Sequence, residues 1–92
     1  MMCGGHSALK EPEPELVELV MGLRNDIETQ ASHKYETFEV VGFTSQVVAG
    51  TIFRVHVRVA HAEHEHIYVQ IFRPLPHTGQ PAQVQVVQMT PF

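Results

Sequence analysis

The chain has 92 residues, 43% of them hydrophobic, and a formal charge of −4 at pH 7. This length corresponds to one domain, near the lower end of what folds without disulfides or metal ions. The acidic balance argues against a nucleic-acid backbone or an anionic membrane as the main partner. Cys3 is the single cysteine, so an intrachain disulfide is impossible and the fold must be held by packing, which fits a reducing compartment.

No apolar stretch is long enough to span a bilayer, and residues 1–10 lack the basic start and apolar run of a secretory signal. We therefore expect a cytoplasmic protein in which residues 1–92 form one domain. Residues 1–12 contain two glycines, one proline and few large apolar groups. This composition predicts a flexible N-terminal arm before the folded part begins.

A helix is predicted from about Glu13 to residues 32–33. Apolar side chains recur there at helical spacing, namely at Leu16, Leu19, Val20, Leu23 and Ile27. Pro14 suits the first helical turn, because its missing N–H would have no helical partner there. Gly22 is the weak point, since glycine inside a helix costs about 1 kcal/mol relative to alanine. Its missing side chain predicts a close approach of the helix to a sheet.

After the helix the period becomes two, which is typical of half-buried strands. The alternating apolar positions are Phe53, Val55, Val57 and Val59, then Ile67, Val69 and Ile71, and finally Val84 and Val86. An earlier stretch, residues 35–48, is longer and less regular, and Gly42 within it predicts a bulge or bend. One helix followed by consecutive hairpins predicts an α+β fold, with a single helix packed on an antiparallel sheet of four to five strands.

The run Gln46-Val47-Val48-Ala49-Gly50 is apolar at the point where the pattern requires a turn between two strands. Hairpin tips are normally built from Gly, Asn, Asp and Pro. Two interpretations follow. Either both valines form an apolar patch at the tip, which usually marks a surface that binds something, or they are ordinary strand residues and only Ala49 and Gly50 turn.

This QVVAG run resembles the first-hairpin signature of the cystatins, specifically of the intracellular stefin branch. The resemblance extends to Met2-Cys3-Gly4-Gly5 at the start and to Phe72-Arg73-Pro74-Leu75-Pro76-His77 near the end. It implies a reversible, tight-binding inhibitor of papain-like cysteine proteases such as cathepsins. Such an inhibitor is not an enzyme, uses no covalent chemistry and needs no cofactor or metal. It occludes the active-site cleft with a wedge of three segments.

The resemblance also implies a role for each segment. The valines of residues 46–50 would lie on the apolar walls of the cleft, with Gln46 and the tip backbone supplying hydrogen bonds. Leu75, Pro76 and His77 would form the second hairpin, on the leaving-group side. Secreted cystatins carry a proline–tryptophan pair there, but this chain has no tryptophan; the leucine–proline version is the stefin one.

In the arm, Met2 and Cys3 would occupy the substrate-side subsites. Gly4 would let the chain turn away before a scissile bond is offered, because glycine adopts backbone angles closed to other residues. Gly5 could take the same role if Gly4 did not. The competing interpretation is an ordinary terminal tail whose glycines carry no function.

The sequence contains features of three other classes of function. Catalysis by Cys3 is disfavoured, because a nucleophilic thiol needs a fixed, electropositive site and Cys3 lies on the expected flexible arm. The run from 61 to 66, His-Ala-Glu-His-Glu-His, is the basis for a metal-binding module, since His64 and His66 would share a face if extended; a solvated polar hairpin is the alternative. Exchange of the valine hairpin between copies would turn the monomer into a domain-swapped dimer.

Overall fold

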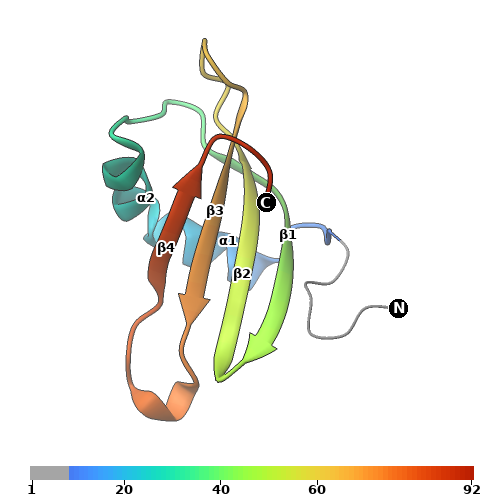
Figure 1. Cartoon of the computed structure of the whole chain (residues 1–92), viewed down its shortest axis with the longest axis vertical. Helices are drawn as coiled ribbons and strands as arrows, with labels where there is room; N and C mark the ends of the chain where they lie inside the picture. The colour runs from blue at the N-terminus through green and yellow to red at the C-terminus, as the bar shows by residue number, and fades with distance from the viewer. Residues whose placement is uncertain (1–8) are drawn as a thin grey trace.

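The computed structural model describes residues 9–92, which form two helical segments packed on one face of a four-stranded antiparallel sheet (Figure 1). The helices are α1 (Pro14–Gly22) and α2 (Arg24–Ala31). The strands are β1 (Glu39–Val48), β2 (Gly50–Arg58), β3 (His66–Arg73) and β4 (Gln83–Gln88), with a 3-10 turn, η1 (Pro76–Thr78), before β4. The strand order is β1-β2-β3-β4. The predicted α+β class and antiparallel sheet are confirmed.

The helical region is interrupted once, at Leu23. Its backbone dihedrals are φ −100° and ψ 5°, and its N–H is shared between the carbonyls of Leu19 (3.2 Å) and Val20 (3.0 Å). The interruption directly follows Gly22, whose low helix propensity makes departure from helical geometry inexpensive. The expected close approach of Gly22 to the sheet is wrong, because a Cβ atom built there would meet nothing within 4 Å. The region ends at Ala31, followed by Ser32 at φ 58°, close to the predicted end.

The core lies between the helices and the inner face of the sheet. The alternation in β2 and β3 and the helical stripe point into it, as predicted. In β4 the prediction of Val84 and Val86 is wrong at Val86: the register shifts between Gln70 and Ile71, so Val87 packs on the core with Val84, and Val86 lies opposite Gln70. The core's fully buried members, with no exposed surface, are Val20, Ile27, Val55, Val57, Ile67, Val69 and Ile71. Each such side chain contributes about 1.5–3 kcal/mol by leaving water, so this layer holds the sheet and helices together without a disulfide.

The predicted irregularity at Gly42 is a β-bulge, since the pairing of β1 with β2 shifts between Val40 and Gly42. A Cβ atom on Gly42 would lie 2.9 Å from the carbonyl oxygen of Lys10. The missing side chain therefore allows residues 9–10 to lie against β1. There Lys10 pairs with Phe43 in an antiparallel bridge, with N–H···O distances of 2.7 and 3.1 Å. The end of the predicted arm is thus hydrogen-bonded to β1.

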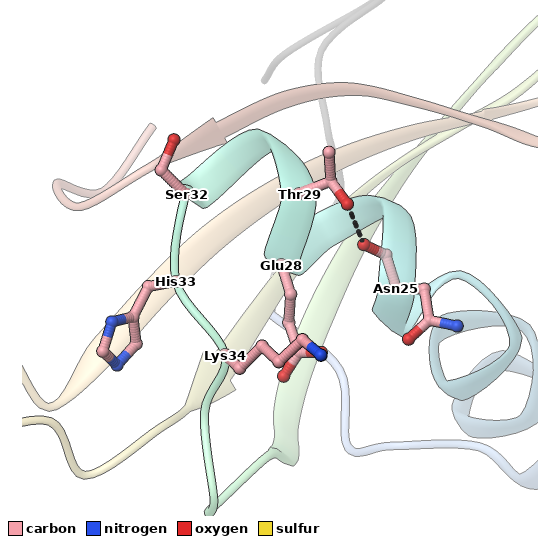
Figure 2. Close-up of a pocket in the computed structure, with 6 residues that line it drawn as sticks. All are labelled: Asn25, Glu28, Thr29, Ser32, His33 and Lys34. Carbon is pink, nitrogen blue, oxygen red and sulfur yellow. Dashed lines mark hydrogen bonds between the residues drawn. The ribbon is translucent and has the colours of Figure 1, made fainter.

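The predicted strand start near Tyr35 is wrong, because β1 begins only at Glu39. Tyr35 is instead a buried residue of the connection between α2 and β1. Its N–H donates to the Glu28 carboxylate at 2.9 Å, and Arg24 donates to its carbonyl. This N–H, followed by Arg24, holds the pKa of Glu28 below its ordinary value despite burial. Figure 2 shows Glu28 on the side of α2 that lines a cavity of about 570 Å³.

Candidate functional site

The first hairpin is paired to its very tip. Val47 lies opposite Thr51 and Val48 opposite Gly50, so that Ala49 alone makes the turn. Both valines are therefore strand residues, as the second interpretation held. They are nevertheless open to solvent, with 82% of Val47 and 45% of Val48 exposed. The hairpin thus presents apolar side chains on a backbone that is already ordered, which combines the two interpretations.

Gly50 lies where this hairpin packs against the end of β3. Its φ is +128°, a conformation that L side chains rarely adopt. A Cβ atom there would lie 2.6 Å from the Arg73 carbonyl oxygen and 2.9 Å from the Phe72 ring. Only glycine fits this position without displacing backbone. The glycine of the motif consequently allows the first hairpin to pack directly against the segment that leads into the second connection.

The second connection is ordered by local contacts. Pro76 begins the 3-10 turn, and the N–H and hydroxyl of Thr78 donate to the Leu75 carbonyl at 3.0 and 2.8 Å. The turn closes on Gly79, at φ 67°. No residue of the turn is buried, and Leu75 keeps 39% of its surface exposed. The predicted Leu75, Pro76 and His77 therefore lie on the surface of a loop stiffened by proline.

The two segments meet at one end of the molecule, drawn at the bottom of Figure 1. A cavity of about 510 Å³ lies between them. Its lining residues come from α1, the start of β2, the end of β3 and the connection that follows it: Leu19, Gly50, Thr51, Arg73, Pro74, Leu75, Pro76, Gln80 and Ala82. Of the predicted residues, Gly50, Leu75 and Pro76 line this cavity, and the tip valines belong to the same hairpin. Gln46 is half-buried opposite Ile52. Met2, Cys3, Gly4 and Gly5 lie outside the described residues.

Two contributors to this end were missed by sequence reasoning. Leu19 lines the cavity from α1, although the sequence indicated only that it widened the apolar stripe. Arg73 supplies a positive charge beside the uncharged tip, with its guanidinium 5.1 Å from the centre of the Phe53 ring. The sequence signal for Arg73 was its place between Phe72 and Pro74, where β3 leaves the sheet.

The shared face on which the metal-binding interpretation depended does not form in the histidine-rich run. His66 is the first residue of β3, whereas His64 precedes the strand and stacks on His61, with ring centres 4.6 Å apart. Between residues 9 and 92, no three His, Cys, Asp or Glu side chains are grouped so that they could hold a metal ion. In the same part of the chain, no helix has the length and apolar character needed to cross a membrane.

Comparison with known proteins identifies the class. Residues 4–77 match the cystatin domain, and the chain therefore belongs to the cystatin family. It is 35% identical over 81 residues to Cystatin-B of Pan troglodytes and 33% identical over 81 residues to Cystatin-B of Homo sapiens, in each case covering 88% of this chain and 81% of the relative. It is 29% identical over 89 residues to Cystatin-A1 of Sus scrofa, covering 97% of this chain and 84% of the relative.

These relatives place the chain in the stefin branch that its motifs indicated. Cystatins are protease inhibitors rather than enzymes, which confirms the prediction that this chain is not an enzyme. Both hairpin segments described above fall within the matched residues or at their end.

Proposed function

We propose that this protein is a reversible, tight-binding inhibitor of papain-like cysteine proteases, including cathepsins, and that it occludes their active-site cleft with a three-part wedge. The observation that carries the proposal is the 82% exposure of Val47 on a hairpin paired to its tip. Membership of the cystatin family supports it. A large apolar side chain held in water on an ordered backbone is suited to a partner with a preformed apolar groove.

Rigidity favours tight binding at this end. The first hairpin loses little conformational freedom on association, because its backbone is already hydrogen-bonded up to Val48. The second connection is fixed by Pro76 and by the bonds from Thr78 to Leu75. The cavity between them, lined mainly by apolar groups, offers a second place for a protease surface residue to pack. The free-energy cost of lost conformational entropy on binding is therefore expected to be small compared with the free energy gained by burying apolar surface.

The antiparallel bridge at Lys10 supports the third part of the wedge. Because the bridge is antiparallel, the direction from Lys10 to Leu9 is the direction from Phe43 toward the Val48 end of β1. Lys10 is six positions after Gly4, a length of chain that would span about 20 Å if extended. The path along β1 from Phe43 to Val48 is about 17 Å. A chain of this length would let Gly4 reach the tip, where it would turn the chain away from the nucleophile. Gly5 could take the same role, and Met2 and Cys3 would occupy the substrate-side subsites.

The proposed mechanism needs no bond making and no cofactor. The protease nucleophile is covered by the tip of residues 46–50, with Gln46 and the tip backbone orienting the contact and Leu75, Pro76 and His77 covering the leaving-group side. The monomer is the inhibitory form, and a dimer that exchanges the first hairpin between copies is a side product. We place this activity in the cytoplasm, in keeping with the stefin-type relatives and the single cysteine.

Nuclear magnetic resonance mapping tests the proposal. The labelled chain is titrated with papain whose active-site cysteine has been blocked by a small alkyl group. We expect the largest amide shift changes at residues 46–51 and 75–79, with residues 61–65 at the opposite end of the sheet as internal reference. Changes centred on residues 61–65, or on the sheet face away from the helices, would refute the wedge.

A further inference from the structure

A second cluster of side chains lies at the end of the molecule opposite to the wedge. The imidazole cluster consists of His33, His61 and His64, with ring centres 4.4 Å apart for His33 and His61 and 4.6 Å apart for His61 and His64. Tyr35 completes it, 4.8 Å from His33 and 5.9 Å from both His61 and His64. Four rings from two parts of the chain thus form one cluster.

The cluster joins two connections that share no backbone pairing in the sheet. His33 and Tyr35 belong to the connection between α2 and β1, whereas His61 and His64 belong to the turn between β2 and β3. Both connections lie at the top of Figure 1. The turn is itself ordered, because the His61 N–H donates to the His64 carbonyl at 2.9 Å. The rings therefore hold the α2–β1 connection against the hydrogen-bonded turn between β2 and β3.

One polar contact of the cluster requires a neutral imidazole, and the ring stacking disfavours a second charge. The N–H of Glu63 donates to Nδ1 of His61 at 3.2 Å, and that nitrogen accepts only while it carries no proton. The hydroxyl of Tyr35 lies 3.2 Å from Nε2 of His64. His61 and His64 are stacked with an interplanar angle of 25°. Protonating both would place two like charges face to face.

The charged groups around the cluster do little to stabilise protonated histidines. Glu63 is the carboxylate of the turn that favours the charged form of His64, while His61 and His33 oppose it. On the side of the α2–β1 connection, Lys34 adds a positive charge and lines the adjoining cavity of about 400 Å³. In α2, the Glu28 carboxylate is already engaged by Arg24 and by the N–H of Tyr35. Burial, reinforced by His61, lowers the pKa of His64 below its ordinary value.

We propose that the imidazole cluster is an acid-sensitive latch, which holds the α2–β1 connection on the β2–β3 turn when neutral and releases it when protonated. Because the folded-state pKa of His64 lies below the ordinary value of 6.5, the latch contributes its full stability above about pH 6.5 and loses it as the pH falls further. Tyr35, 4% exposed, closes the core at this end. Release therefore loosens the helices from the sheet there, while the wedge end stays paired. The latch does not depend on protease binding.

Amide hydrogen exchange at pH 7.5 and pH 5.0, corrected for intrinsic rates and with a chelator present, tests this proposal. We expect the protection factor of the Tyr35 amide to fall at least about tenfold at pH 5.0 relative to pH 7.5, which corresponds to about 1.4 kcal/mol. The Phe43 amide, bonded to Lys10 at the other edge of the sheet, should change far less. Equal protection of the Tyr35 amide at the two pH values would overturn the latch.

A variant carrying His33→Gln, His61→Gln and His64→Gln should lose this pH dependence, whereas His77→Gln, on the exposed turn after β3, should keep it. Persistence of the dependence in the triple variant would also overturn the proposal. Should the triple variant fail to fold, the proposal is tested by following the protonation of the histidine rings of the wild-type chain as the pH is varied. His64 titrating below 6.5, together with loss of Tyr35 protection over the same range, supports the latch; titration at or above 6.5 refutes it.

Discussion

Replacing Val47 by aspartate isolates the role of the hairpin tip. Val47 is 82% exposed and lies on β1 opposite Thr51, so the change removes little packing from the free protein. The loss of β-propensity costs up to about 1 kcal/mol. The variant should therefore fold, with a free energy of unfolding within about 1 kcal/mol of wild type. Any large loss of inhibition then reports on the contact with the protease rather than on folding.

The expected loss can be worked from the exposure of Val47. Full burial of a valine is favourable by about 1.5–3 kcal/mol. With 82% of the residue still exposed, burial in a cleft contributes about 1.2–2.5 kcal/mol. An unpaired carboxylate placed against an apolar wall adds a penalty of about 3–5 kcal/mol. The sum, about 4–7 kcal/mol, corresponds to an increase in Kd of about a thousandfold or more.

The assay is the steady-state inhibition of papain at varied inhibitor concentration, with urea unfolding of each variant alongside. The matched control is Val41→Asp, since Val41 is another exposed valine of β1, with 42% of its surface accessible, and lies at the bulge. It is six residues from Val47, about 20 Å along the strand. We expect Val41→Asp to inhibit like wild type. If Val47→Asp binds as tightly as Val41→Asp, the hairpin tip does not enter the cleft.

The remaining predictions concern stability and association. Gly50→Ala should lower the free energy of unfolding by at least about 2 kcal/mol in urea titration, because it combines a positive φ with a clash against Arg73. Gly79→Ala, at φ 67° with nothing within 4 Å, should cost only about 1 kcal/mol, and equal costs would contradict the packing argument. Glu28→Gln should flatten the loss of stability in acid: its folded pKa is lowered, so its contribution is present above the ordinary value of 4.5 and is lost as the pH falls below it. An unchanged stability profile below pH 4.5 would show that the bond to Tyr35 is not responsible. A hairpin-exchanged dimer separated by gel filtration should inhibit papain at least about tenfold more weakly than the monomer, because exchange straightens the tip; equal inhibition would contradict this.

Features governed by local periodicity could be predicted from the sequence. The alternation in β2 and β3 and the stripe along the helices point into the core, because burial follows the repeat of each element. The bulge at Gly42 was also predictable, since a glycine inside a strand pattern often marks a bulge or the close approach of another backbone segment, here Lys10.

Features that depend on the path of connections could not be predicted. Gly50 meets Arg73 across 23 positions of sequence, and Tyr35 meets His64 across 29. No local pattern encodes which loops come together at one end of a sheet. The break at Leu23 is a further case, because Gly22 marked a weak position without indicating that the helix would restart one residue later. His64 and His66 would share a face only if both were extended, but His64 lies in a turn and His66 begins β3.

The most direct test of the central claim is a titration of active papain with the monomeric protein near neutral pH, following hydrolysis of a small fluorogenic peptide. The account predicts that activity disappears at one inhibitor per active site, returns on dilution or on displacement by a competing inhibitor, and leaves the chain uncleaved. Full papain activity in the presence of a micromolar excess of the folded protein would contradict it.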